Sequence, residues 1–243
     1  MLKYIYIGVF LVFFVNMLCG QATDERVLWT MGLNYKLPEK FKTYIPKSSS
    51  FKENLKLRQL MGNPAQGIIS DDDEFISFFR IFRISTKEDS IRINSLFPGA
   101  NMSPSIRHID NIRHQIKLLY GDSAKQNWLN YVDYWPNDKA KEVFNADSVI
   151  VYTAKLKKEE VYEGKYDHFG ALYLSKKDRG FVNYFFLFTE KANEQYDSYI
   201  KNIQQSLYYD DWTGLKETPD PRDLGGPVTI YKEGNEWKVK EGT

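Results

Sequence analysis

The chain is almost free of cysteine. Cys19 is the one cysteine among 243 residues, and it lies inside an apolar N-terminal segment. Cleavage after that segment leaves no thiol, which excludes disulfides, CxxC redox chemistry and thiolate zinc sites. The remaining chain, about 220 residues, must be stabilised by its core alone, and chains of this length bury roughly 70% of their surface.

The chain also lacks an excess of charge of either sign. It has 33 basic and 32 acidic residues, and losing Lys3 with the N-terminal segment makes the numbers equal. We therefore expect no nucleic-acid partner and no attraction to an anionic membrane. The segment from Arg179 (RGFVNYFF) partly resembles the aromatic strand of an RNA-recognition motif. Val182 stands where that motif has glycine or alanine, so we interpret the segment as core.

Motifs of catalysis and cofactor binding are missing as well. The sequence contains no GxSxG, HExxH, phosphate loop or dinucleotide fingerprint, so we predict no cofactor. His108 and His114 are six positions apart and would lie on different faces of a helix. We therefore predict no metal site.

Residues 1–20 combine one basic residue, an apolar run and small residues. This layout is typical of a bacterial signal peptide, with cleavage after Gly20 or Ala22. Two alternatives stay open: lipidation of Cys19, and an uncleaved anchor, although Tyr4 to Leu18 is short against the roughly 20 residues of a spanning helix. We expect a periplasmic or secreted protein, or one that is lipid-anchored through Cys19, without stable membrane insertion after cleavage.

One domain is predicted over residues 27–209. Short extended pieces are expected at Leu33–Leu37 and Phe41–Ile45, and strands at Glu74–Ile84, Ser90–Leu96, Ser148–Leu156, Phe169–Ser175 and Phe181–Phe188. Helices are expected at Phe51–Met61, Pro104–Gly121, Asp122 to Trp135, Asp138–Phe144, and from a Thr189 cap to Leu207.

The run Phe185–Phe188 does not alternate between apolar and polar residues, so its strand is covered on both faces. This predicts an α+β fold with a central, largely antiparallel sheet flanked by helices. Residues 210–243 form a polar tail with a terminal hairpin of Pro227–Tyr231 and Glu236–Lys240.

The order of these elements resembles the PsbP-like α/β/α sandwich superfamily. The stretches FNADSVIVY (Phe144–Tyr152) and GFVNYFFLFTEKANEQYDSYIKNIQQSLYY (Gly180–Tyr209) also look like those of an uncharacterised family of exported bacterial proteins. The helices between Pro104 and Phe144 depart from the simplest form of the sandwich. The resemblance implies a binding or assembly partner of a larger complex, and it brings no catalytic motif.

Two polar features are candidate sites. His168 follows Asp167 at the start of a strand, where a carboxylate can orient a histidine that acts as general base. The acidic run Asp71 to Glu74 lacks the alternating ligands and the glycine of a calcium loop, so we interpret it as a solvated turn.

An aromatic segment is the candidate ligand surface. Tyr131, Tyr134 and Trp135 follow Trp128, and aromatic faces beside polar groups suit sugars or peptides. The same spacing also describes ordinary packing. Tyr134 lies off the helical stripe from Trp128 to Trp135, so we expect it to be the most exposed member.

Three Asp-Ser tripeptides resemble a short bacterial acceptor for O-linked glycosylation, at Ser90, Ser123 and Ser148. Ser123, at a predicted helix start, should be the most accessible. The N-glycosylation sequon at Asn101 is followed by Pro104, which disfavours its use.

Taken together, these features favour an exported, non-catalytic binding or assembly module of the bacterial cell envelope, whose partner is an envelope protein, a peptide or a glycan. One alternative is an envelope hydrolase that uses His168 with a nearby carboxylate such as Asp167. The other is a structural subunit of an envelope complex, which would expose a large apolar patch when isolated.

Overall fold

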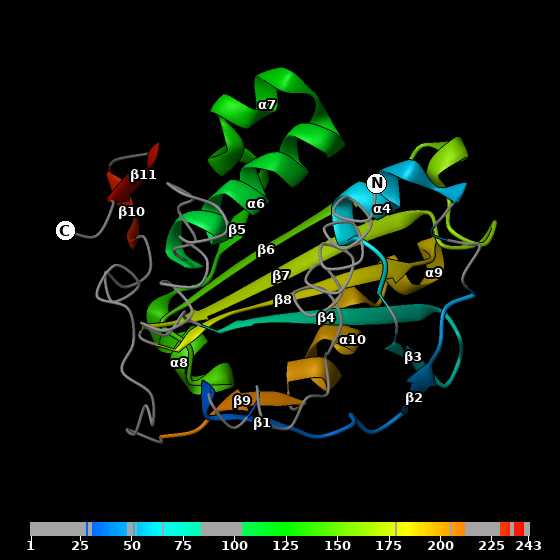
Figure 1. The fold of residues 1–243 in the computed structure, drawn as a ribbon, viewed down its shortest axis with the longest axis horizontal. Helices are drawn as coiled ribbons and strands as arrows, with labels where there is room; N and C mark the ends of the chain where they lie inside the picture. Colours follow the sequence, from blue (N-terminus) through cyan, green and yellow to red (C-terminus); the bar gives the residue numbers. More distant parts are fainter. Residues whose placement is uncertain are drawn as a thin grey trace, which may run out of the picture.

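The computed structural model describes residues 28, 31–47, 51, 53–64, 66–83, 104–177, 179–204, 206–211, 229–233 and 236–240. Seven strands form one sheet in the order β2-β3-β4-β8-β7-β6-β5, and all neighbouring strands are antiparallel (Figure 1). They are β2 (Phe41–Tyr44), β3 (Gly67–Ser70), β4 (Phe75–Arg83), β5 (Asp133–Tyr134), β6 (Ser148–Lys155), β7 (His168–Lys176) and β8 (Gly180–Phe188).

Helices cover both faces of this sheet (Figure 1). On one face lie α4 (Leu55–Met61), α6 (Pro104–Tyr120), α7 (Asp122–Gln126) and the 3-10 helix η1 (Trp128–Tyr131). On the other lie α8 (Asn137–Phe144), α9 (Glu190–Asn193), α10 (Tyr196–Gln204) and the antiparallel pair β1 (Leu33–Tyr35) and β9 (Leu207–Tyr209). The predicted α+β class with an antiparallel sheet between helices is confirmed.

The sheet separates two hydrophobic cores, and β8 contributes to both. Phe186 and Phe188 enter the core beneath α8 and α10, whereas Phe185 and Leu187 enter the core beneath α4 and α6. Successive side chains of a strand point to opposite faces, so an uninterrupted apolar run fits only a strand that is covered twice.

Two of the predicted helices are divided in the structure and are shorter than predicted. The segment from Asp122 to Trp135 is not one helix: it divides into α7, η1 and β5, where Tyr134 pairs with Ile150 of β6. The last helix is also divided, into α9 and α10, and Leu207 lies in β9 opposite Tyr35. In both cases backbone pairing with a distant strand replaces the helical continuation that local periodicity suggested.

Several other predictions concern the ends of the chain and one internal strand. The terminal hairpin is present as β10 (Thr229–Glu233) and β11 (Glu236–Lys240), which pair antiparallel. The predicted strand Ser90–Leu96 and the N-terminal segment 1–20 lie outside the described residues. Within the part that is described, no helix has the length and apolar character to cross a bilayer.

Candidate functional site

Strand register brings the polar candidates to one end of the sheet. His168 pairs with Lys155 of β6 on one side and with Phe188 of β8 on the other. Phe188 in turn pairs with Phe75, the first residue of β4. The turn Asp71–Glu74, the start of β7 and the β8–α9 junction therefore lie together, and we call this region the polar end of the sheet.

The predicted pairing of His168 with Asp167 is present in this region. The imidazole Nδ1 lies 2.9 Å from Asp167 Oδ1, and the side chain is 8% exposed. The ring also stacks on Phe188, with 5.2 Å between ring centroids. On the opposite edge of the ring, Nε2 lies 3.9 Å from Glu190 Oε2. A general base of a hydrolase faces a nucleophile or a water instead, so this orientation does not by itself favour the hydrolase hypothesis.

A lysine links the two carboxylates. Lys155 Nζ lies 2.5 Å from Glu190 Oε2 and 4.0 Å from Asp167 Oδ2. The hydrogen bond with Lys155 lowers the pKa of Glu190, and the same bond raises the pKa of Lys155. Sequence reasoning missed both Lys155 and Glu190, because only strand pairing brings them to His168.

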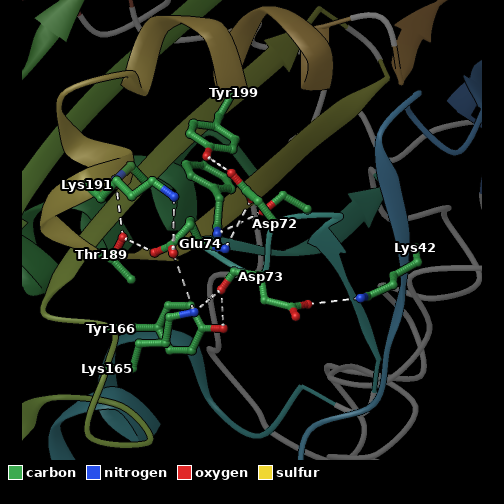
Figure 2. Close-up of polar contacts among 12 residues, drawn as sticks. Lys42, Asp72, Asp73, Glu74, Lys165, Tyr166, Thr189, Lys191 and Tyr199 are labelled. Carbon is green, nitrogen blue, oxygen red and sulfur yellow. Dashed lines mark hydrogen bonds and ion pairs between the residues drawn. The ribbon is translucent and has the colours of Figure 1, made fainter.

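The acidic run forms the turn between β3 and β4, as predicted, but the side chains of Asp72, Asp73 and Glu74 contact other protein groups (Figure 2). Asp72 accepts hydrogen bonds from Ser70 Oγ at 2.6 Å, from Tyr199 Oη at 2.6 Å and from the Glu74 amide at 3.2 Å. Burial raises the pKa of Asp72, but these hydrogen bonds outweigh it and the pKa lies below its usual value. The Tyr199 contact ties the turn to α10.

Lysines surround the rest of the turn (Figure 2). Asp73 pairs with Lys42 at 2.9 Å, and its carbonyl oxygen accepts hydrogen bonds from Lys165 Nζ at 2.7 Å and Tyr166 Oη at 2.9 Å. Glu74 lies 3.5 Å from Lys191. Because protein donors occupy these oxygens, the arrangement is that of a structural turn rather than an open calcium loop.

Thr189 connects this turn to α9, and its replacement by alanine should weaken the fold measurably. Its hydroxyl donates to Glu74 Oε2 at 2.6 Å and accepts from the Ala192 amide at 3.2 Å, which makes it the N-cap of α9. We expect Thr189→Ala to lower the free energy of unfolding by about 1 kcal/mol, measured by urea denaturation. Thr189→Ser keeps the hydroxyl and serves as the control. Equal stabilities of the two variants would contradict this assignment.

The aromatic candidates lie on another part of the molecule, around α6 and η1. Tyr131 is 37% exposed and its ring packs against that of Tyr120, itself 39% exposed, with 4.6 Å between centroids. Tyr120 Oη donates a hydrogen bond to the Thr153 carbonyl at 2.7 Å, which anchors its ring. Sequence reasoning missed Tyr120, although an aromatic residue directly before the helix-ending Gly121 was a usable signal.

The other two aromatic candidates are half-buried. Tyr134 donates a hydrogen bond to Asn137 Oδ1 at 3.2 Å. Trp135 stacks on Phe144, and Lys139 Nζ lies 3.7 Å from its ring centroid. The expectation that Tyr134 is the most exposed member is wrong, because the segment is not a continuous helix and η1 turns Tyr131 outward instead.

The possible modification sites differ in accessibility. Ser123 is exposed in α7, whereas Ser148 is buried and its hydroxyl lies 2.6 Å from that of Ser175. Cys19, Ser90 and Asn101 lie outside the described residues.

The other two histidines lie in different environments. His108 is buried against Tyr173 and Phe181, and burial lowers its pKa to about 3. His114, on the same helix, is exposed.

Comparisons with known proteins add little. No protein-family model and no curated protein matches the chain. Among solved structures, the solution structure of cyanobacterial PsbP (CyanoP) from Synechocystis sp. PCC 6803 aligns at 11% identity with a TM-score of 0.28, over 74% of this chain and 88% of that chain. A TM-score of this size does not establish a shared fold, so the architecture rests on the strand order and helix placement described above.

Proposed function

We propose that this protein is an exported, non-catalytic binding module of the bacterial cell envelope, and that it holds a glycan on Tyr120 and Tyr131. Export rests on the signal-like segment 1–20. The observation that carries the binding proposal is the pair of exposed tyrosine rings in mutual contact. An apolar ring face beside polar groups matches a sugar, which presents C–H groups on its faces and hydroxyls at its edge.

The surroundings of the tyrosine pair support a glycan ligand. Asn130 and Asp133, which lie one and two positions from Tyr131 in the sequence, are both exposed and offer hydrogen-bonding groups for sugar hydroxyls. The hydrogen bond from Tyr120 to the Thr153 carbonyl holds one ring in place before any ligand arrives. A ring that is already ordered loses less conformational entropy on binding.

Calorimetric titration of the purified protein with soluble peptidoglycan glycan fragments freed of their peptide stems, and separately with the stem peptides, tests the proposal. We expect Tyr131→Ala and Tyr120→Ala each to weaken binding about tenfold, which corresponds to about 1.4 kcal/mol. Tyr208→Ala is the matched control, because Tyr208 is 41% exposed but lies on β9, in the layer on the opposite face of the sheet. An equal loss in the control variant, or no binding of any fragment, would contradict the proposal.

The same titration separates the alternatives. Binding of peptides in place of glycans would support a binding module whose ligand is a peptide. Hydrolysis of the fragments that disappears in His168→Ala would instead support the envelope hydrolase, in which Asp167, 2.9 Å from His168, would orient the imidazole.

A further inference from the structure

A second feature, independent of the tyrosine pair, lies at the polar end of the sheet. Asp167, His168 and Glu190 each place one donor atom within 4.8 Å of the donor atoms of the other two. They come from the start of β7 and from α9, and the packing of His168 on Phe188 fixes the imidazole between the two carboxylates. An imidazole nitrogen and a carboxylate oxygen, here His168 Nε2 and Glu190 Oε2, are ligands that suit zinc and similar divalent ions.

The distances within the cluster distinguish two kinds of contact. Asp167 Oδ1 is within hydrogen-bond distance of His168 Nδ1, at 2.9 Å. The 3.9 Å from His168 Nε2 to Glu190 Oε2 is too long for a hydrogen bond. Two ligands of one tetrahedral zinc ion, each about 2.0–2.2 Å from the metal, lie about 3.5 Å apart, so the gap needs only a small contraction. A carboxylate on Nδ1 is also the usual partner of a metal-bound histidine, because it orients the ring.

Lys155 currently supplies the positive charge in this cluster. Its ammonium contacts Glu190 Oε2 and faces Asp167 Oδ2, and its side chain is 64% exposed. A flexible, exposed lysine can turn into solvent and release both carboxylates. A dication would then balance their two negative charges.

We propose that His168 Nε2 and Glu190 bind a divalent transition-metal ion of the zinc class, that Asp167 orients the imidazole through Nδ1, and that the ion and the Lys155 ammonium compete for Glu190. The imidazole selects zinc, nickel or copper over calcium and magnesium, which prefer oxygen ligands alone. The sequence predicts no such site, because the cluster exists only after β6, β7 and α9 are assembled.

Titration of the full, untagged protein with Zn²⁺, followed by calorimetry, tests this proposal. We expect one ion per chain, with affinity about tenfold or more weaker in His168→Ala and in Glu190→Gln. Lys155→Met should bind Zn²⁺ several-fold more tightly, since it removes the competing ammonium and keeps most of the length of the side chain. His114→Ala is the matched control, because His114 is an exposed histidine on α6, away from the cluster.

Each result decides the proposal, provided that circular dichroism shows folded variants. A gain in Lys155→Met together with losses in His168→Ala and Glu190→Gln supports it. Failure of both the wild type and Lys155→Met to bind Zn²⁺ overturns it. Binding that is unchanged in His168→Ala, or lost in His114→Ala, places the ion elsewhere and overturns it as well. None of these variants changes the tyrosine pair, so the glycan titration fails or succeeds separately.

Discussion

Replacement of Phe75 by alanine is expected to lower the free energy of unfolding by about 3–5 kcal/mol. Phe75 is fully buried where β4 begins, and its ring stacks on Tyr199 of α10 with 5.0 Å between centroids and 7° between planes. It also contacts Phe186 and Phe188 of β8, at 5.2 Å and 5.6 Å. The truncation therefore opens a cavity at the point where the sheet meets α10.

Urea denaturation followed by tryptophan fluorescence and circular dichroism measures this loss. Native domains are stable by about 5–15 kcal/mol, so the expected loss is a large fraction of the total. Ile45→Ala is the control, since Ile45 is largely exposed after β2 and its truncation should change stability by no more than about 0.5 kcal/mol. Similar values for the two variants would show that Phe75 is not part of a close-packed core.

Gln115→Leu should also be strongly destabilising, for a different reason. Gln115 is buried on α6, where its Oε1 accepts hydrogen bonds from the Tyr152 and Tyr173 hydroxyls and its Nε2 donates to the Leu60 carbonyl. Burial raises the pKa of both phenols, which therefore remain donors at ordinary pH. Leucine has similar size but leaves three buried polar groups without this partner, and only the two phenols, which also hydrogen-bond each other, keep a second one. Each such group costs about 1–3 kcal/mol, so we expect a loss of about 3 kcal/mol or more.

A triple variant separates this effect from simple misfit of the leucine. Gln115→Leu combined with Tyr152→Phe and Tyr173→Phe removes both hydroxyls that lose Gln115 as acceptor, and it should recover part of the lost stability. The free energies of unfolding of the single and triple variants are compared by urea denaturation. A triple variant that is less stable than Gln115→Leu would show that the hydrogen bonds at Gln115 are not the source of the loss.

Much of the secondary structure follows from local patterns. The β6, β7 and β8 strands, α6 and α8 lie close to their predicted bounds, because each carries its own periodicity and end signals, such as Pro104 at the start of α6 and Gly121 after its end. The two-sided apolar run of β8 also predicted that helices cover both faces of the sheet. Some short elements were not predicted. The β3 strand, for example, has only two apolar side chains, Ile68 and Ile69, which are too few to show an alternating pattern.

The candidate sites, too, were only partly predictable from local sequence patterns. Asp167 and His168 are neighbours in the chain, so their pairing was predictable from the sequence, and Tyr131 was recognisable as part of an aromatic segment. Glu190 and Lys155 join His168 only through the register of β6, β7 and β8, and Tyr120 meets Tyr131 only because η1 replaces the predicted helix.

The sequence alone therefore determined the fold class, the balanced charge and the signal-like N-terminal segment, since composition and local periodicity are sufficient for each. The tertiary structure decided which polar and aromatic side chains meet. Such contacts depend on hydrogen-bond register between strands that are far apart in the chain, and a shift of one residue would turn each strand's side chains to the opposite face.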